Sequence, residues 1–245
     1  MIANSSVEIV LPIFSGNIAQ VEGSTIKLLD HLKKIKGPYS FTVTLSINGR
    51  EVTELLTVVT AICENNRNVS YSLTEKQGKG HGVISAWEVS AADILVYMDI
   101  DLATSLDSFE QLLCEVKNGG GISIGSRYLS TSTLERSLKR YALSRVYHSV
   151  LIRGLLRLPV KDVQCGFKAM EQSVFFEIRP YLKSYDFFFD AELVYTCFKM
   201  NKRIIEIPVH WAETKLSSVK LFRTSVSFFI SALLLRAKYS RFKKL

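Results

Sequence analysis

Short apolar runs alternate with longer amphipathic segments in the first half of the chain, and this alternation constrains the fold more than any other feature. Runs typical of buried strands cover residues 7–13, 41–47, 69–73, 94–98 and 121–125. Helical patterns lie between them, over residues 23–36, 51–65, 78–90 and 106–117. Such alternation predicts an α/β fold, with a mostly parallel central sheet flanked by helices on both faces.

The second half departs from this pattern. We expect a long helix over 134–158, another over 187–200 and a strand over 204–210. The sequence shows no internal repeat and no low-complexity linker, so one domain is the simplest organisation.

The net charge of +8 is concentrated at the C-terminal end. Eight bases and no acid follow Glu213, which leaves the first 213 residues formally neutral. A basic end attracts polyanions or an anionic membrane surface, although a merely solvated end is an equal alternative. The apolar run 226–235 is too short to span a bilayer. It predicts either a helix lying in the membrane interface or an ordinary core helix.

Cysteine usage and the first residues bear on the compartment. The four cysteines are scattered and form no C-x-x-C pair, which favours reduced thiols in a cytosolic protein. Residues 1–14 lack a basic start followed by a long apolar run, so we expect no signal peptide.

Two carboxylates, Asp99 and Asp101, directly follow the apolar run 94–98. Side chains at i and i+2 of an extended chain point to the same side, and an open α/β sheet binds its ligand at the carboxyl ends of its strands. Like charges this close are unfavourable without a cation between them. Because hard cations prefer carboxylate oxygens, the pair predicts a divalent metal site for a phosphorylated substrate.

A glycine-rich turn at 78–82 contains Lys79 and Gly80. Its backbone N–H groups and its lysine suit a phosphate, but a flexible turn explains the pattern as well. The turn matches neither a P-loop nor a dinucleotide fingerprint, which argues against a nicotinamide-dependent oxidoreductase.

Arginines form the second candidate anion site. Arg127 ends the strand predicted at 121–125, and Arg136, Arg140 and Ser144 lie four residues apart on one helix face. The arginine fork matches phosphate oxygens, so the group predicts an anion clamp, with a solvated helix face as the alternative.

Six motifs, taken together and in order, resemble one family. They are Gly78-Lys79-Gly80, Asp99-Ile100-Asp101, Gly125-Ser126-Arg127, Asp162-Val163-Gln164-Cys165-Gly166-Phe167-Lys168, Phe189-Asp190-Ala191-Glu192 and Glu206-Ile207-Pro208-Val209-His210-Trp211. The series resembles the family-2 glycosyltransferases of GT-A fold, and within them the polyprenyl-phosphate sugar transferases of the dolichyl-phosphate glucosyltransferase and mannose synthase type. The resemblance covers most of residues 7–225.

The resemblance implies an inverting, metal-dependent glycosyltransferase. Its donor would be a UDP- or GDP-sugar, its acceptor a dolichyl- or undecaprenyl-type phosphate, and its cofactor Mg²⁺ or Mn²⁺. The catalytic domain would span 1–218, with a nucleotide-sugar half at 1–125 and an acceptor half at 126–218. The basic, amphipathic tail at 219–245 would rest on the cytoplasmic face of a membrane. A second copy or a membrane-anchoring protein would be a compatible partner, and nucleic acid would not.

The resemblance also implies residue roles. The catalytic set is Asp99, Asp101, Arg127, Asp162 and Gln164. Asp99 and Asp101 would bind the metal, with Asp101 as the main ligand. The substrate-binding set is Pro12, Asn48, Lys79, Gly80, Arg136, Arg140, Ser144 and Asp190. Within these sets Arg127, Arg140 and Ser144 would hold the acceptor phosphate, and Asp162 and Gln164 would border the sugar.

The chemistry agrees with this inventory. A lipid phosphate has a second pKa of about 6 and is already a nucleophile at neutral pH, so no general base is required. A metal would stabilise the departing diphosphate, and in-line attack would invert the anomeric carbon.

The nucleotide side departs from the family pattern. The first strand continues as Pro12-Ile13-Phe14-Ser15-Gly16-Asn17 instead of a Pro-x-Tyr-Asn-Glu type segment. The second ends at Asn48 without an acid, although an amide can still bond a base edge. These departures keep two alternatives open: a family-2 transferase with another glycan or glycolipid acceptor, and a degenerate, non-catalytic membrane-associated homologue.

Overall fold

The computed structural model describes residues 4–49, 53–119, 121–135, 145, 149–213 and 221–240. Within them a seven-stranded sheet runs in the order β3-β2-β1-β4-β7-β5-β8. Its strands are β1 (Ser5–Ile13), β2 (Tyr39–Asn48), β3 (Val69–Thr74), β4 (Ile94–Met98), β5 (Ile122–Ser126), β7 (Phe167–Glu171) and β8 (Ile204–Pro208). Neighbouring strands are parallel except where β7 pairs with β4 and β5. The expected mostly parallel α/β sheet is therefore confirmed.

A second, two-stranded sheet pairs β6 (Thr133–Glu135) with β9 (His210–Ala212). The described helices are α1 (Ile18–Leu32), α2 (Thr53–Asn65), α3 (Lys79–Val89), α4 (Phe109–Lys117), α6 (Gln172–Ile178), α7 (Phe189–Lys199) and α8 (Leu221–Ser240). Shorter segments are the 3-10 turns η1 (Ser15–Asn17), η2 (Leu106–Ser108) and η4 (Arg179–Tyr181), and the π-helical η3 (Ser149–Leu156).

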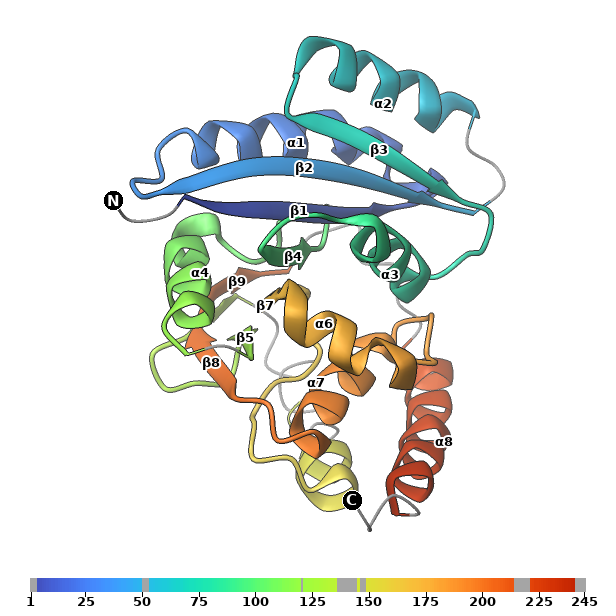
Figure 1. Ribbon diagram of the computed structural model, residues 1–245. Coiled ribbons are helices and arrows are strands. Elements are labelled where there is room, and N and C mark those ends of the chain that lie inside the picture. The colour runs from blue at the N-terminus through green and yellow to red at the C-terminus, as the bar shows by residue number, and fades with distance from the viewer. Residues whose placement is uncertain are drawn as a thin grey trace.

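Helices cover both faces of the sheet (Figure 1), because its strands are apolar on both sides. In β1, Val7, Ile9 and Leu11 pack in one core with α1, α2 and α4. Val10 points the other way, into a core formed with α3, α6, α7 and α8. The side chains of β4 alternate between the same two cores.

The reversed strand β7 positions the chemistry. Tyr97 of β4 lies directly opposite Lys168 of β7, and Met98 lies opposite Phe167. The segment that precedes β7 therefore runs past the end of β4, where the carboxylate pair begins.

Several expected boundaries are wrong for identifiable reasons. The helix expected from residue 134 does not start there, because Thr133–Glu135 pairs with β9 as a strand. Residues 136–144 and 146–148 of that helix lie outside the described residues. The strand expected over 204–210 is two strands in two sheets, and it breaks at Pro208, which has no N–H to continue a ladder.

The C-terminal helix α8 has two different apolar faces. Phe228, Ala232, Leu235 and Tyr239 are buried in the core with α7. Phe229, Ile230, Leu233 and Leu234 are exposed. The buried face agrees with a core helix over 226–235, and the exposed face agrees with a helix in the membrane interface. The predicted domain boundary at 218/219 falls within 214–220, outside the described residues.

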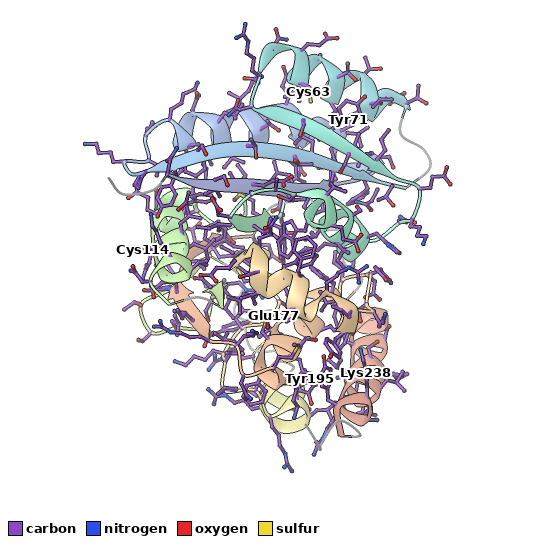
Figure 2. All side chains as sticks on the ribbon, in the orientation of Figure 1. Cys63, Tyr71, Cys114, Glu177, Tyr195 and Lys238 are labelled. Atoms are coloured by element: carbon purple, nitrogen blue, oxygen red, sulfur yellow. The ribbon has the colours of Figure 1, made fainter. Side chains whose placement is uncertain are left out.

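The cysteines are free thiols, as expected. Cys63 on α2 and Cys114 on α4 lie on separate parts of the molecule (Figure 2). Of the helices that the structure describes, none combines the length and apolarity needed to cross a bilayer.

Candidate active site

The carboxylate pair lies in a turn just beyond β4. The strand ends at Met98, and the Leu102 N–H donates to the Asp99 carbonyl at 3.1 Å to close the turn. Asp101 Oδ1 accepts the Ala103 N–H at 3.1 Å. The strict side-chain alternation of an extended strand therefore does not extend to the pair, and the turn itself sets the direction of both carboxylates.

Lys79, at the first position of α3, joins this turn to the first turn of α7. Its Nζ lies 2.8 Å from Asp99 Oδ1 and 2.9 Å from Asp190 Oδ2. The other oxygen of Asp190 bonds to Lys168 Nζ and to the Tyr97 hydroxyl. We refer to Lys79, Tyr97, Lys168 and Asp190 as the Asp190 cluster.

The two lysines of this cluster respond to burial in opposite ways. Burial alone would lower the pKa of Lys79, but the carboxylates of Asp190 and Asp99 outweigh it and raise the pKa. Burial, reinforced by the charge of Lys79, lowers the pKa of Lys168 to about 7. Burial raises the pKa of Asp190, and Lys79 opposes that rise. The site therefore contains one firmly charged ammonium and one that titrates near neutral pH.

The glycine turn is shaped by packing. A Cβ on Gly80 would come within 2.8 Å of Phe189 Cβ and 2.9 Å of the Ser184 carbonyl. Gly78 has a φ of +143° and also lies against Tyr185, whose carbonyl accepts the His81 N–H at 3.2 Å. The glycines thus let α3 start directly against the segment before α7, and this close approach brings Lys79 to Asp190.

Asn48, expected to read the nucleotide, is buried at the end of β2. Its Nδ2 donates to the Ile13 carbonyl at 2.9 Å, and its Oδ1 accepts the Gly78 N–H at 3.1 Å. Pro12 lies beside the same turn, 3.3 Å from where a Cβ on Gly82 would be. Asn48 therefore ties β1 to the glycine turn, and its contact with a base remains a prediction.

Arg127 forms a second buried pair, with Asp162. Its Nε and Nη2 donate to Asp162 Oδ2 and Oδ1 at 2.6 and 2.9 Å. The same carboxylate accepts the backbone N–H groups of Arg127 and Gln164, each at 3.1 Å. Glu206 Oε1 in turn accepts the Asp162 N–H at 3.0 Å. Two nitrogens of the guanidinium are thus committed to Asp162, and its role toward an acceptor phosphate stays a prediction.

The residues present suit a divalent cation that arrives with its own phosphate ligands. No group of three or more His, Cys, Asp or Glu side chains gathers in the described part of the chain. Mg²⁺ commonly uses one or two carboxylates and completes its shell with phosphate and water. Asp99 is 47% exposed and already faces a cation, and Gly166 leaves the space that its carboxylate fills. Asp99 and Asp101 are the side chains that would hold the ion.

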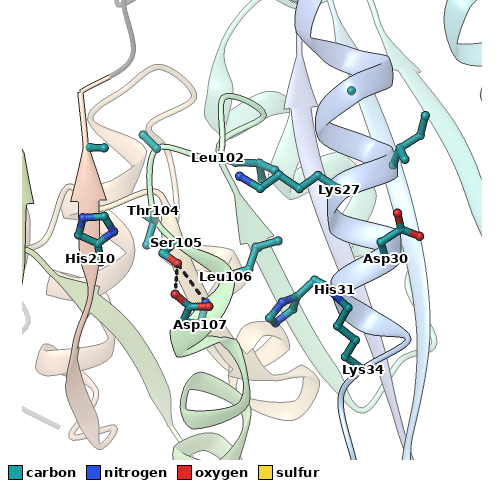
Figure 3. A pocket seen from close by; sticks show the side chains of 14 residues that line it. Lys27, Asp30, His31, Lys34, Leu102, Thr104, Ser105, Leu106, Asp107 and His210 are labelled. Carbon is teal, nitrogen blue, oxygen red and sulfur yellow. Dashed lines mark hydrogen bonds between the residues drawn. The ribbon is translucent and has the colours of Figure 1, made fainter.

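A cavity of about 590 Å³ adjoins the turn on the α1 side. Figure 3 shows Lys27 and His31 of α1 facing Leu102 and Asp107 across it. Its lining begins at Leu102, one residue after the carboxylate pair, and neither Asp99 nor Asp101 is part of it.

Asp101 lies in the turn after β4. The other expected residues that the structure describes fall into three groups. One joins Lys79, Asp99 and Asp190, another joins Arg127, Asp162 and Gln164, and the last places Pro12, Asn48 and Gly80 around the glycine turn. Arg136, Arg140 and Ser144 lie outside the described residues.

Sequence reasoning missed Lys168 and Tyr97 as site residues. A usable signal was present, since Lys168 stands among Phe167, Ala169 and Met170. A lysine inside an apolar strand requires a buried acid as partner.

No family model matches the chain. The glycosyltransferase AglD of Haloferax volcanii is 30% identical over 225 residues, which is 90% of this chain and 35% of that protein. The dolichyl-phosphate beta-glucosyltransferase of Dictyostelium discoideum is 27% identical, over 97% of this chain and 76% of the relative. The chain thus spans about a third of the length of the archaeal relative and about three quarters of the other.

The fold has solved counterparts. Glucosyl-3-phosphoglycerate synthase from Mycobacterium tuberculosis, in complex with Mn²⁺, UDP and glucosyl-3-phosphoglycerate, superposes with a TM-score of 0.65. The match covers 95% of this chain and 80% of that one, at 16% identity, and therefore shows the fold alone. Sequence and fold together confirm the resemblance carried by the six motifs, and the chain is a relative of the polyprenyl-phosphate sugar transferases with the GT-A glycosyltransferase fold.

Proposed function

We propose that this chain transfers a sugar from a nucleotide-sugar to a polyprenyl phosphate, with inversion and with a divalent metal. The observation that carries the proposal is the carboxylate pair at the end of β4, with Asp99 2.8 Å from Lys79 of the glycine turn. Relatives named for dolichyl phosphate and a structural counterpart holding Mn²⁺ and UDP support the same assignment.

The chain's own residues would divide the work by charge. Asp99 and Asp101 would hold the cation and Lys79 would face the donor diphosphate, where an ammonium offsets phosphate charge. A bound Mg²⁺ or Mn²⁺ would neutralise the charge that develops on the departing diphosphate. The acceptor phosphate is itself the nucleophile, so the arginine side need only bring it within reach of the anomeric carbon.

The test is a transfer assay on the purified chain. It supplies polyprenyl phosphate, Mg²⁺ or Mn²⁺ and a panel of UDP- and GDP-sugars. Asp101→Ala should abolish turnover, and Asp30→Ala, which removes an exposed acid of α1 paired with Lys33, should leave it unchanged. Absence of transfer from every donor would refute the proposal, and full activity of Asp101→Ala would remove the metal role of that residue.

The same proposal places the protein on a membrane surface through α8. Phe229, Ile230, Leu233 and Leu234 are 44–66% exposed, while the opposite face of the helix is buried in the core. An exposed apolar helix face in a basic segment binds anionic bilayers by combining burial of apolar area with electrostatic attraction.

Vesicle sedimentation checks this orientation. Leu233→Ser with Leu234→Ser should reduce binding to vesicles containing anionic lipid. Phe176→Ser on α6, which removes a side chain of similar exposure (45%), should not. Equal loss in both variants would argue against α8 as the membrane face.

A further inference from the structure

The buried end of the Asp190 cluster contains an ion pair that the proposed reaction does not itself use. Lys168 has no exposed surface, and it bonds to Asp190, to the Tyr97 hydroxyl at 2.9 Å and to the Cys165 carbonyl at 2.7 Å. Asp190 in turn bonds to Lys79 through its other oxygen. One carboxylate therefore serves two ammonium groups.

The charges form a single row from the interior to the surface, in the order Lys168, Asp190, Lys79 and Asp99. The side chains of the first three are 0%, 4% and 8% exposed, whereas Asp99 is 47% exposed. Charges in a poorly solvated interior interact more strongly than charges in water. Removal of a charge at the buried end of the row should therefore alter the electrostatic interactions of Asp99 at its solvent-exposed end.

We propose that Lys168 and Asp190 are positioning residues that set, through Lys79, how strongly Asp99 binds a divalent cation. The inference rests on the proposed function, because it takes Asp99 as a metal ligand. Lys79 competes with the cation for Asp99, and Asp190 draws Lys79 away from it. Lys168 also attracts Asp190, and this attraction weakens the interaction between Asp190 and Lys79.

The surroundings of Lys168 agree with a tuning role. Charged or titratable groups reach it from β4 (Tyr97), from α3 (Lys79), from α7 (Asp190) and from the segment before β7 (Cys165 and Asp162). Of the groups just named Lys79 repels it, and the pKa of Lys168 lies at about 7, chiefly because of burial. Its charge is therefore more easily removed than that of Lys79, whose pKa is raised.

The direction of each substitution follows from the row. Lys168→Met leaves Asp190 entirely to Lys79, which should bind Asp99 less tightly, so Mn²⁺ affinity should rise about threefold. Asp190→Asn leaves Lys79 with Asp99 alone, so Mn²⁺ affinity should fall about tenfold. The double variant removes one charge of each sign and should lie between them.

Free Mn²⁺ is measured by electron paramagnetic resonance while the metal alone is titrated into the full chain. Lys202→Met is the matched control, since Lys202 pairs with Glu177 at the surface and its loss changes the net charge equally. The balanced double variant keeps the inference testable if Asp190→Asn fails to fold.

The outcomes separate the two proposals. An affinity for Mn²⁺ in Lys168→Met that matches wild type, or that rises as much in Lys202→Met, overturns the positioning role and leaves the transfer assay untouched. Failure of the wild-type chain to bind Mn²⁺ in the absence of a nucleotide would also overturn the positioning role. Opposite shifts in Lys168→Met and Asp190→Asn support the positioning role even where no donor sugar is transferred.

Discussion

The Asp190 cluster and the Arg127–Asp162 pair are both buried, yet they are built differently. Within the described part of the chain, Asp162 accepts two bonds from one guanidinium and two from backbone N–H groups, so one carboxylate is held by a fixed charge and two amides. Asp190 instead divides its two oxygens between two lysines and a tyrosine. Arginine stays charged in any protein environment, whereas a buried lysine changes its pKa readily.

The difference suggests a division of labour between the two sites. Asp162 outweighs the effect of burial and raises the pKa of Arg127, which fixes that pair as a scaffold. The Asp190 cluster contains a lysine with a pKa of about 7 that is connected to Asp99 through Asp190 and Lys79. Residues 162–168 connect the two, since Asp162 begins this segment and Lys168 ends it.

The largest effect is expected from breaking the rigid pair. Asp162→Ala leaves the guanidinium of Arg127, 12% exposed, without its carboxylate. An uncompensated buried charge should lower the free energy of unfolding by about 3–5 kcal/mol, measured by urea denaturation. Glu88→Ala, which breaks the more exposed pair with Arg179, should lower it by about 0.5 kcal/mol or less. Similar losses in both variants would mean that burial does not make the Arg127–Asp162 pair more important for stability than the exposed pair.

The next effect concerns the glycine between the two sites. A Cβ on Gly166 would collide with the Asp99 carboxylate, which is exposed enough to swing away. Gly166→Ala should therefore leave the fold intact and reduce turnover about 100-fold, as expected for a misplaced catalytic group.

Gly23→Ala on α1 is the control for that change. Nothing lies within 4 Å of the added Cβ, and alanine is the better helix former. We expect full turnover and a slightly higher melting temperature. Loss of turnover in Gly166→Ala that is accompanied by unfolding would argue for a purely structural role of this glycine.

The sequence predicts some elements of the fold better than others. Strands β1 to β5 follow from apolar runs of strand length, and the run 94–98 matches β4 to the residue. The sequence does not predict the antiparallel β7, because Phe167–Glu171 is short and holds two charged residues, and pairing with β4 and β5 makes it a strand. The start of the helix expected at 134 fails because tertiary pairing with β9 overrides the local pattern.

At the site, the sequence predicts the carboxylates better than the buried residues that bond to them. The motifs predict Asp99, Lys79 and Asp190 as site residues, and the structure brings them together. The interaction between Lys168 and Tyr97 depends on cross-strand register, which single motifs do not contain. Asn48 shows the converse case, where a residue chosen for ligand contact is held by the backbone of Ile13 and Gly78.

The smallest expected effect is a pH dependence that belongs to the Asp190 cluster alone. The ordinary pKa of a lysine is 10.5, and burial lowers that of Lys168 to about 7 in the folded chain. Between these values the unfolded chain binds one more proton than the folded chain, so the free energy of unfolding rises with pH. Over pH 7–8.5 the rise from this one residue should be on the order of 1–2 kcal/mol.

Lys168→Met should remove this rise, because its side chain binds no proton in either state. Comparison of Lys168→Met with wild type cancels the contributions of titrating groups that both chains share. Burial raises the pKa of Cys165 to about 11 and that of Cys197 to about 12, so these thiols lower stability chiefly above this pH window. Urea denaturation at pH 7.0, 7.5, 8.0 and 8.5 should give a flat profile for Lys168→Met and a rising one for wild type and Lys202→Met. Parallel profiles would mean that Lys168 stays charged throughout the window, and the Asp190 cluster would then be as fixed as the Arg127–Asp162 pair.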